Sequence, residues 1–245
     1  MQNLRGKVIA ITGASAGIGR SIALKLAENG ARIVAGARNT EKLKKLIGEI
    51  QSIGGEAVFV PMDVTDKADV GRLVNAAVEQ YGRLDGIVNN AGISQLSRID
   101  ELDSEGWEEM IDINIKGVLY GMAAAIPIFK QQQSGHIVNI ISTAGLKIVP
   151  LMGVYAGTKN AIRTIAEAFR QESDGTIRIT GISPGFVKTD FADRIKNEAM
   201  KTAVQREMDH MGLDPMAIAN AVLYALSQPE DVEIGEIVIR PARQN

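Results

Sequence analysis

KVIAITGASAGIGR, residues Lys7 to Arg20 of this 245-residue chain, places a glycine-rich turn between an apolar run and a helical pattern. Its first half, Lys7–Thr12, is a short apolar run that ends in glycine, which is typical of a fully buried strand. From Gly17 to Asn29 apolar residues recur at helical spacing, and Gly30 is a stop signal. The glycines at 13, 17 and 19 therefore lie in a strand-to-helix turn. The N-terminus of such a helix offers free N–H groups and partial positive charge to a phosphate.

Strands and helices alternate along the rest of the chain. Further strands are expected at Arg32–Ala37, Glu56–Val64, Leu84–Gly92, His136–Ser142, Ile177–Gly185 and Glu236–Pro241. Further helices are expected at Thr40–Ile50 (with Thr40 as cap), Thr65–Tyr81, Ser104–Gln131, Gly153–Glu172, Val187–Met211 and Pro215–Leu226. This alternation predicts an α/β protein, a parallel sheet with helices on both faces. We find no linker, repeat or low-complexity segment, so one domain over residues 1–245 is expected.

The composition argues against several classes of protein. The net charge is −2 with both signs interspersed, so no basic face for nucleic acid is expected. The chain has no Cys and two His, so we expect no disulfide, no thiolate nucleophile and no metal site. No signal peptide is recognised, and the longest apolar stretch, Gly117–Phe129, is shorter than a membrane span. We expect a cytoplasmic protein without membrane or nucleic-acid partners.

Tyr155 and Lys159 stand four residues apart in YAGTK and so share one face of a helix. An ammonium group beside a phenol favours the phenolate, so we expect Lys159 to lower the pKa of Tyr155. The phenol would then exchange protons near neutral pH. Ser142 ends a strand thirteen residues earlier, at the rim where that helix begins. Its hydroxyl is expected to hydrogen-bond a substrate carbonyl that the phenol protonates.

Each feature has a simpler interpretation when taken alone. The glycines also suit an ordinary tight turn, and a Tyr–Lys pair at this spacing also arises by chance. Ser142 also suits a turn or cap, and Asn114, within DINIKG, a surface or kink position. In the functional interpretation, the short amide of Asn114 holds a bent helix and a water near Lys159.

Taken together, the motifs resemble the short-chain dehydrogenase/reductase family. They are, in order, TGASAGIG (Thr12–Gly19), Asp63–Val64, NNAG (Asn89–Gly92), Asn114, Ser142, Tyr155, Lys159 and Pro184–Gly185. The resemblance implies a Rossmann-like, doubly wound parallel sheet of seven strands in the order 3-2-1-4-5-6-7. It also implies a nicotinamide cofactor and a homotetramer, with a dimer as the alternative.

The resemblance also implies a role for each matching residue. Tyr155 is the general acid in reduction and the base in oxidation, and Lys159 lowers its pKa and binds the nicotinamide ribose. Ser142 orients the carbonyl, and Asn114 holds a water of the proton relay. The implied cofactor contacts are Gly13, Ser15, Gly17, Ile18, Gly19, Arg38, Asp63, Val64, Asn90, Ala91, Gly92, Tyr155, Lys159, Pro184, Gly185, Val187 and Thr189.

VAGARNT, from Val34 to Thr40, bears on which nicotinamide cofactor binds. Sites for NAD place an Asp or Glu about 20 residues beyond the glycine loop. Here that position is Ala37, and it is followed by Arg38, whose guanidinium can bind a phosphate in bidentate fashion. NADP(H) is therefore favoured. Some NADP-dependent relatives add a basic residue inside the loop, where this chain has Ser15, so Arg38 is expected to carry most of the phosphate recognition.

The resemblance implies that the segment 188–212 forms a lid over the substrate, although its apolar spacing also suits core packing. Candidate substrate contacts are Leu146, Leu151, Met152, Val154, Phe191 and Met208. The expected reaction is hydride transfer between NADP(H) and a ketone, a 3-oxo or 3-hydroxy compound, or another carbonyl/alcohol pair. The ending EIVIRPARQN resembles carbonyl reductases and 3-hydroxy-acid (serine) dehydrogenases. The alternatives are a 3-oxoacyl-[acyl-carrier-protein] reductase and a catalytically inactive NADP-binding regulator.

Overall fold

The computed structural model describes residues 4–195 and 197–244, apart from the side chain of Arg194. Within these residues the strands are β1 (Val8–Thr12), β2 (Arg32–Ala37), β3 (Ala57–Pro61), β4 (Gly86–Asn89), β5 (Gly135–Ile140), β6 (Ile177–Pro184) and β7 (Glu236–Ile239). The helices are α1 (Gly17–Glu28), α2 (Thr40–Ser52), α3 (Lys67–Tyr81), α4 (Ser104–Ile111), α5 (Gly117–Gln132), α6 (Gly153–Glu172), α7 (Glu198–Met211) and α8 (Pro215–Leu226).

The strands form one parallel sheet in the order β3-β2-β1-β4-β5-β6-β7, which confirms the predicted Rossmann-like topology. β1 lies between β2 and β4, with Ile9 opposite Ile33 on one side and Gly86 on the other. The chain order reverses at this point of the sheet. In open α/β sheets, ligands bind at such a switch point, beyond the carboxyl ends of the strands.

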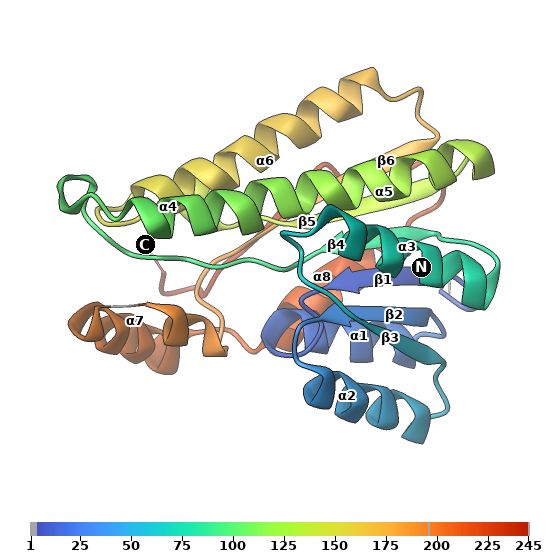
Figure 1. Cartoon of the computed structure of the whole chain (residues 1–245), viewed down its shortest axis with the longest axis horizontal. Helices are drawn as coiled ribbons and strands as arrows, with labels where there is room; N and C mark the ends of the chain where they lie inside the picture. Colours follow the sequence, from blue (N-terminus) through green and yellow to red (C-terminus); the bar gives the residue numbers. More distant parts are fainter. Residues whose placement is uncertain (1–3, 196, 245) are drawn as a thin grey trace.

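Helices cover both faces of the sheet (Figure 1). On β1, Ile9 and Ile11 pack with residues of α1, α2 and α8, whereas Val8 and Ala10 pack with residues of α3, α5 and α6. Every residue of β1 is buried. A strand buried on both faces reads as a continuous apolar run, because alternate side chains face different helix layers.

The helix predicted over Val187–Met211 is wrong in its first part. Val187 instead forms a β-bridge with Leu213, and a short 3₁₀ turn, η4, covers Asp190–Arg194. The Thr189 hydroxyl caps this turn, and Asn197 caps α7 by accepting a hydrogen bond from Met200 N–H. Two capping side chains within nine residues divide the segment into two elements. A smaller difference concerns α2, which is capped by Asn39 while Thr40 is its first helical residue.

The helix predicted over Ser104–Gln131 is present, but a π-helical turn, η2 (Asp112–Lys116), joins α4 to α5 within it. Among the described residues, Ser104–Gln132 is the one helix whose length and composition would allow it to cross a membrane. In this fold its α5 part packs against the sheet, where Val118, Met122 and Phe129 are buried.

Candidate active site

The glycine loop connects β1 to α1 and is shaped by close backbone contacts. Gly13 has φ +66°, a left-handed conformation that favours glycine. A Cβ at Gly19 would collide with the Asn90 side chain and the Gly13 carbonyl. Gly19 therefore allows α1 to begin directly against the loop.

The N-terminus of α1 lacks the side-chain cap that most other helices here possess. Ala16 is its N-cap residue, and its first turn contains no acidic side chain. Asn or Asp side chains cap five other helices instead, through Asn39, Asp66, Asp103, Asn197 and Asp214. The first N–H groups of α1 are thus left for another acceptor, and a pyrophosphate is the natural one beside a glycine loop.

Thr12 and Asn90 join the glycine loop to the loop after β4. The Thr12 hydroxyl accepts hydrogen bonds from the N–H groups of Asn90 (3.0 Å) and Ala91 (3.1 Å). The Asn90 amide donates to the carbonyls of Thr12 (2.9 Å) and Gly13 (3.2 Å). These four bonds bring Gly13, Asn90 and Ala91, all expected cofactor contacts, to one edge of the sheet.

Asn114 lies in the π turn η2 and is fully buried. Its side chain accepts from Ile93 N–H (2.9 Å) and donates to the Ile93 carbonyl (2.9 Å) and to the Thr158 hydroxyl (3.1 Å). The surface interpretation of Asn114 is therefore wrong, and the bent-helix interpretation fits. Its amide ties the loop after β4 to the helix that carries Tyr155 and Lys159.

Ser142, Tyr155 and Lys159 meet at the carboxyl end of β5. The Ser142 side chain lies close enough to the Tyr155 phenol to act on its pKa. Lys159 Nζ donates to the Ile140 carbonyl (2.9 Å) and lies 5.9 Å from the centre of the Tyr155 ring. Ser142 Oγ also accepts from Ala144 N–H (3.1 Å), so the capping interpretation of this serine holds alongside its place in the cluster.

Burial dominates the protonation of this cluster. It raises the pKa of Tyr155 to about 12, with the Ser142 hydrogen bond acting in the opposite direction, and it lowers the pKa of Lys159 to about 8. The expectation of a lowered phenol pKa is therefore wrong. A buried phenol loses more from desolvation of its anion than it gains here. At neutral pH Tyr155 is a protonated donor.

Arg38 and Asp63 face each other at the carboxyl ends of β2 and β3. Arg38 Nη1 lies 3.6 Å from Asp63 Oδ2, and both side chains are partly exposed. Burial acts to raise the pKa of Asp63, but hydrogen bonds from Thr65 and the charge of Arg38 together lower it. Ala37 is buried immediately before Arg38. This edge therefore carries a guanidinium with exposed surface and one partner carboxylate.

The segment after β6 closes the opposite end of the site. Phe186 N–H donates to Gln244 Oε1 (2.9 Å), while Gln244 Nε2 donates to the Thr143 hydroxyl (3.3 Å). Further along, Thr189 approaches Gly17 so closely that a Cβ there would lie 3.1 Å from Thr189 Cγ2. The loop after β5 that begins with Ser142 and Thr143 is called the catalytic loop below. The expected contacts at Gly185, Val187 and Thr189 thus border the catalytic loop on one side and the glycine loop on the other.

Apolar side chains pack around Tyr155. Phe191 packs against the Tyr155 ring edge to face, with ring centres 5.9 Å apart, and Val154 belongs to the same cluster. Leu151 and Met152 join a second cluster around buried Met208, so core packing describes Met208 better than substrate contact. Leu146 is half exposed and belongs to neither cluster.

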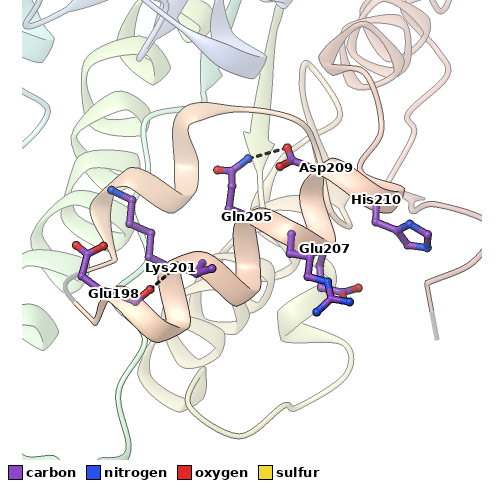
Figure 2. Close-up of a pocket in the computed structure, with 8 residues that line it drawn as sticks. Glu198, Lys201, Gln205, Glu207, Asp209 and His210 are labelled. Carbon is purple, nitrogen blue, oxygen red and sulfur yellow. Dashed lines mark hydrogen bonds between the residues drawn. The ribbon is translucent and has the colours of Figure 1, made fainter.

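A separate hollow of about 810 Å³ lies along α7 (Figure 2). Its lining residues are Glu198, Lys201, Thr202, Gln205, Arg206, Glu207, Asp209 and His210. All are polar or charged, both signs are present, and Gln205 is already hydrogen-bonded to Asp209 (2.8 Å). None of the expected catalytic or cofactor residues lines it, so it is distinct from the site at the sheet edge.

Arg163 and Gln244 are two residues at the site that the sequence motifs missed. Arg163 follows Tyr155 by eight residues and Lys159 by four, so helical spacing alone could have identified it. Gln244 carries no such signal, because its contacts with Thr143 and Phe186 arise only when the chain folds. Among the described residues, no group of three or more His, Cys, Asp or Glu side chains is placed to hold a metal ion.

The donor set fits a dinucleotide. An uncapped helix start lies beside glycines that a Cβ would block, a guanidinium lies at one end, and the Ser142–Tyr155–Lys159 cluster lies at the other. The family model described as "short chain dehydrogenase" matches residues 7–200. The chain belongs to the short-chain dehydrogenase/reductase family.

Similar proteins support this placement. An uncharacterized oxidoreductase of Listeria monocytogenes is 45% identical over 244 residues, 98% of each chain. The alcohol dehydrogenase of the archaeon Thermococcus sibiricus, solved with 5-hydroxy-NADP, is 32% identical over 98% of both chains, with a TM-score of 0.87. A short-chain dehydrogenase/reductase of Burkholderia phymatum, solved with NAD, is 28% identical over 97% of this chain and 90% of its own, with a TM-score of 0.89. The chain is an oxidoreductase of this family, and its structural neighbours include proteins with NADP and with NAD.

Proposed function

We propose that the protein transfers a hydride between NADP(H) and the carbonyl or secondary alcohol of a small molecule. The observation that carries this proposal is the convergence of Ser142, Tyr155 and Lys159 at the carboxyl end of β5, in a fold whose helix α1 starts uncapped after β1. A protonated phenol beside a serine hydroxyl, with an ammonium group nearby, suits polarisation of a carbonyl oxygen.

In the reduction direction, a bound nicotinamide cofactor would supply the hydride for the carbonyl carbon. The Ser142 hydroxyl orients the carbonyl oxygen, and Tyr155 donates its phenolic proton to that oxygen, which gives the alcohol. The Lys159 ammonium stabilises the phenolate that remains. Asn114 supports the proton transfer by holding two groups in place. Its amide bonds the loop at Ile93 and the hydroxyl of Thr158 on α6. In oxidation the phenolate takes the proton back.

The preference for NADP(H) rests on Arg38. Its exposed guanidinium lies at the end of β2, where no carboxylate precedes it to repel a 2′-phosphate. Asp63 is its present partner at 3.6 Å, a contact loose enough for a phosphate to join or replace. The same region of a NAD-specific protein carries the acid that this chain lacks.

The apolar walls support an uncharged substrate. Phe191 and Val154 lie against Tyr155, and Leu151 and Met152 continue the surface toward the segment 188–212, which we propose as the substrate lid. Ketones, 3-oxo esters and diketones fit this environment.

We also propose a cytoplasmic location and a tetramer or dimer. Partly exposed Ile111 and Leu119 on the α4–α5 helix give a second copy of the chain an apolar surface to contact.

The test is an NADPH-oxidation screen over aryl ketones, 3-oxo esters and diketones, with 3-hydroxy acids assayed in the reverse direction. Tyr155→Phe should lower kcat by about 10³-fold, the range for loss of a general acid, because phenylalanine has no proton to donate. Its Kd for NADPH, measured by fluorescence, should stay within a few-fold.

Tyr224→Phe, at an exposed position of α8, is the matched control and should keep full activity. Wild-type turnover by Tyr155→Phe would refute the catalytic assignment. NADPH binding by the wild type without turnover of any carbonyl or alcohol would favour the inactive-regulator alternative.

A further inference from the structure

Arg163 lies on α6, one helical turn beyond Lys159, and its guanidinium reaches three other segments of the chain. Nη2 donates to the Ser142 carbonyl (3.3 Å), after β5, and to the Ser183 hydroxyl (3.1 Å), near the end of β6. Nε and Nη2 donate to the Glu236 carboxylate on β7 at 3.0–3.2 Å. Nη1 donates to Asn160 Oδ1 (2.6 Å) on its own helix.

Glu236 and Ser183 complete a closed network around this guanidinium. The Ser183 hydroxyl, itself fully buried, donates to Glu236 Oε1 (2.5 Å) while accepting from Arg163. The Arg163 and Glu236 side chains are about three-quarters buried, at 22% and 28% exposure. Burial acts to raise the pKa of Glu236, but its bonds with Arg163 and Ser183 together lower it. The carboxylate is therefore held charged, and the fork of the guanidinium is fixed in orientation.

The network also limits the catalytic loop itself. A Cβ at Gly145 would lie 2.8 Å from Arg163 Nη1 and 3.0 Å from Asn160 Oδ1. The short turn η3 (Thr143–Gly145) is thus packed directly on this pair, immediately after Ser142. Both the carbonyl of Ser142 and the end of its turn are fixed by side chains of α6.

We propose that Arg163, held by Glu236, is a positioning residue that fixes the Ser142 loop relative to the helix carrying Tyr155 and Lys159. Tyr155 sets the position of the proton, and Ser142 must present its hydroxyl at a matching place for the same carbonyl oxygen. Ser142 follows the end of strand β5, whereas Tyr155 lies on helix α6. Contacts between these two elements therefore set the distance between the Ser142 and Tyr155 hydroxyl groups. The Ser183 contact extends the tie to Pro184–Gly185 at the nicotinamide end.

This inference rests on the proposed role of Ser142, and a double-mutant cycle tests it. Arg163→Met should lower kcat for the best carbonyl substrate by about 30-fold, because displacement of a positioned group by 1 Å costs on the order of 10²-fold. In a Ser142→Ala background the same substitution should cost less than about 3-fold, since the residue through which it acts is gone. The Kd for NADPH should change less than about 5-fold, because the glycine loop is untouched.

Arg170→Met is the matched control, because Arg170 lies on the same helix in an exposed ion pair with Glu167 (2.7 Å) and should keep wild-type kcat. If Arg163→Met does not fold, Arg163→Lys and Glu236→Gln replace it: each keeps part of the network and should give a smaller loss in the same direction. Equal losses in the wild-type and Ser142→Ala backgrounds, or no loss in either, would overturn the inference.

Hydrogen exchange gives a readout independent of turnover. In cofactor-free protein, peptides covering residues 140–150 should exchange faster in Arg163→Met than in the wild type or Arg170→Met, because the loop loses its tie to α6. Unchanged exchange there would overturn the inference even if activity fell. Absence of any carbonyl turnover in the wild type would instead contradict the proposed function, and the exchange result would still decide whether Arg163 holds the loop.

Discussion

Arg38 is the residue on which the choice between the two nicotinamide cofactors depends. Its guanidinium is half exposed and paired only loosely, at 3.6 Å, with Asp63. Arg38→Asp should lower kcat/KM with NADPH by about 100-fold, since a charge-assisted bidentate contact is lost and a repulsion is added. With NADH it should stay level or rise, because the new carboxylate can accept from the ribose hydroxyls. Steady-state kinetics with both cofactors measure this.

Arg170→Asp is the control for the charge reversal, because Arg170 is exposed near the C-terminal end of α6. This substitution should leave the ratio of kcat/KM with NADPH to kcat/KM with NADH unchanged. Arg38→Ala separates the two effects of Arg38→Asp: it should lose NADPH efficiency without gaining any with NADH. A preference that stays the same in both Arg38 variants would show that another group recognises the phosphate.

His136 predicts how stability depends on acid pH. It is buried in β5, where its Nε2 is 2.8 Å from the Thr180 hydroxyl, and burial lowers its pKa from 6.5 to about 3. Below pH 6.5, His136 binds a proton in the unfolded chain but stays neutral in the folded protein until the pH approaches 3. The free energy of unfolding should therefore fall with pH, by about 3 kcal/mol between pH 6.5 and pH 4, from this group.

Urea unfolding of the wild type and of His136→Gln between pH 7 and pH 4 checks this prediction. Glutamine cannot take up the proton, so the acid slope should flatten even if the variant is less stable overall. His210→Gln is the control, because His210 is exposed on α7 and should leave the slope unchanged. Parallel slopes for wild type and His136→Gln would contradict the assignment of the acid slope to His136.

At the scale of elements, the parts of the fold that could be predicted are those that follow from local pattern. Short apolar runs marked the strands, and β1 lies where KVIAITG placed it. A bend at Asn114 was expected, but its form, the π turn at Asp112–Lys116, could not be predicted, because the apolar spacing is continuous through it. The Asn114 amide stabilises this turn through two hydrogen bonds to the backbone of Ile93, which lies 21 residues earlier in the chain.

The same limit explains what the sequence revealed about the site. Ser142, Tyr155 and Lys159 follow from motif and spacing, and the structure brings them together. The phenol pKa was predicted in the wrong direction, because neighbouring charge is visible in a sequence and burial is not. Glu236 and Gln244 were missed for a related reason: each reaches the site from a late segment that meets the catalytic loop only in the folded chain.

At the scale of the whole molecule, α7 is a helix held by few buried contacts. It lies apart from both helix layers (Figure 1), and Met208 is its one buried residue. The segment 188–212, which contains α7, is closed at its base by two backbone hydrogen bonds of 2.9 Å. Lys188 N–H donates to the Leu213 carbonyl, and Leu213 N–H donates to the Phe186 carbonyl. A segment with little buried surface and a fixed base opens at lower free energy than the core.

The start of the segment 188–212 also lies beside the glycine loop. Thr189 approaches Gly17 of the glycine loop, and Asp190 pairs with Lys42 of α2 across 3.8 Å. A dinucleotide lying on the glycine loop would therefore contact the base of the segment 188–212. Binding that favours the closed position should stabilise it according to the ligand concentration relative to Kd.

Limited trypsinolysis tests this coupling. Without cofactor, the first cuts should fall within 188–212, where Lys188 is exposed and Lys201 and Arg206 lie on weakly held α7. NADPH at about 100 times its Kd should slow these cuts by at least about 10-fold, because cleavage follows the open fraction. At that same NADPH concentration Arg38→Asp should lose the protection while its cofactor-free rate stays at the wild-type value. First cuts in α2, which is equally rich in lysine, would show that 188–212 is not the least stable segment, and cleavage unaffected by NADPH would show that the cofactor does not hold it.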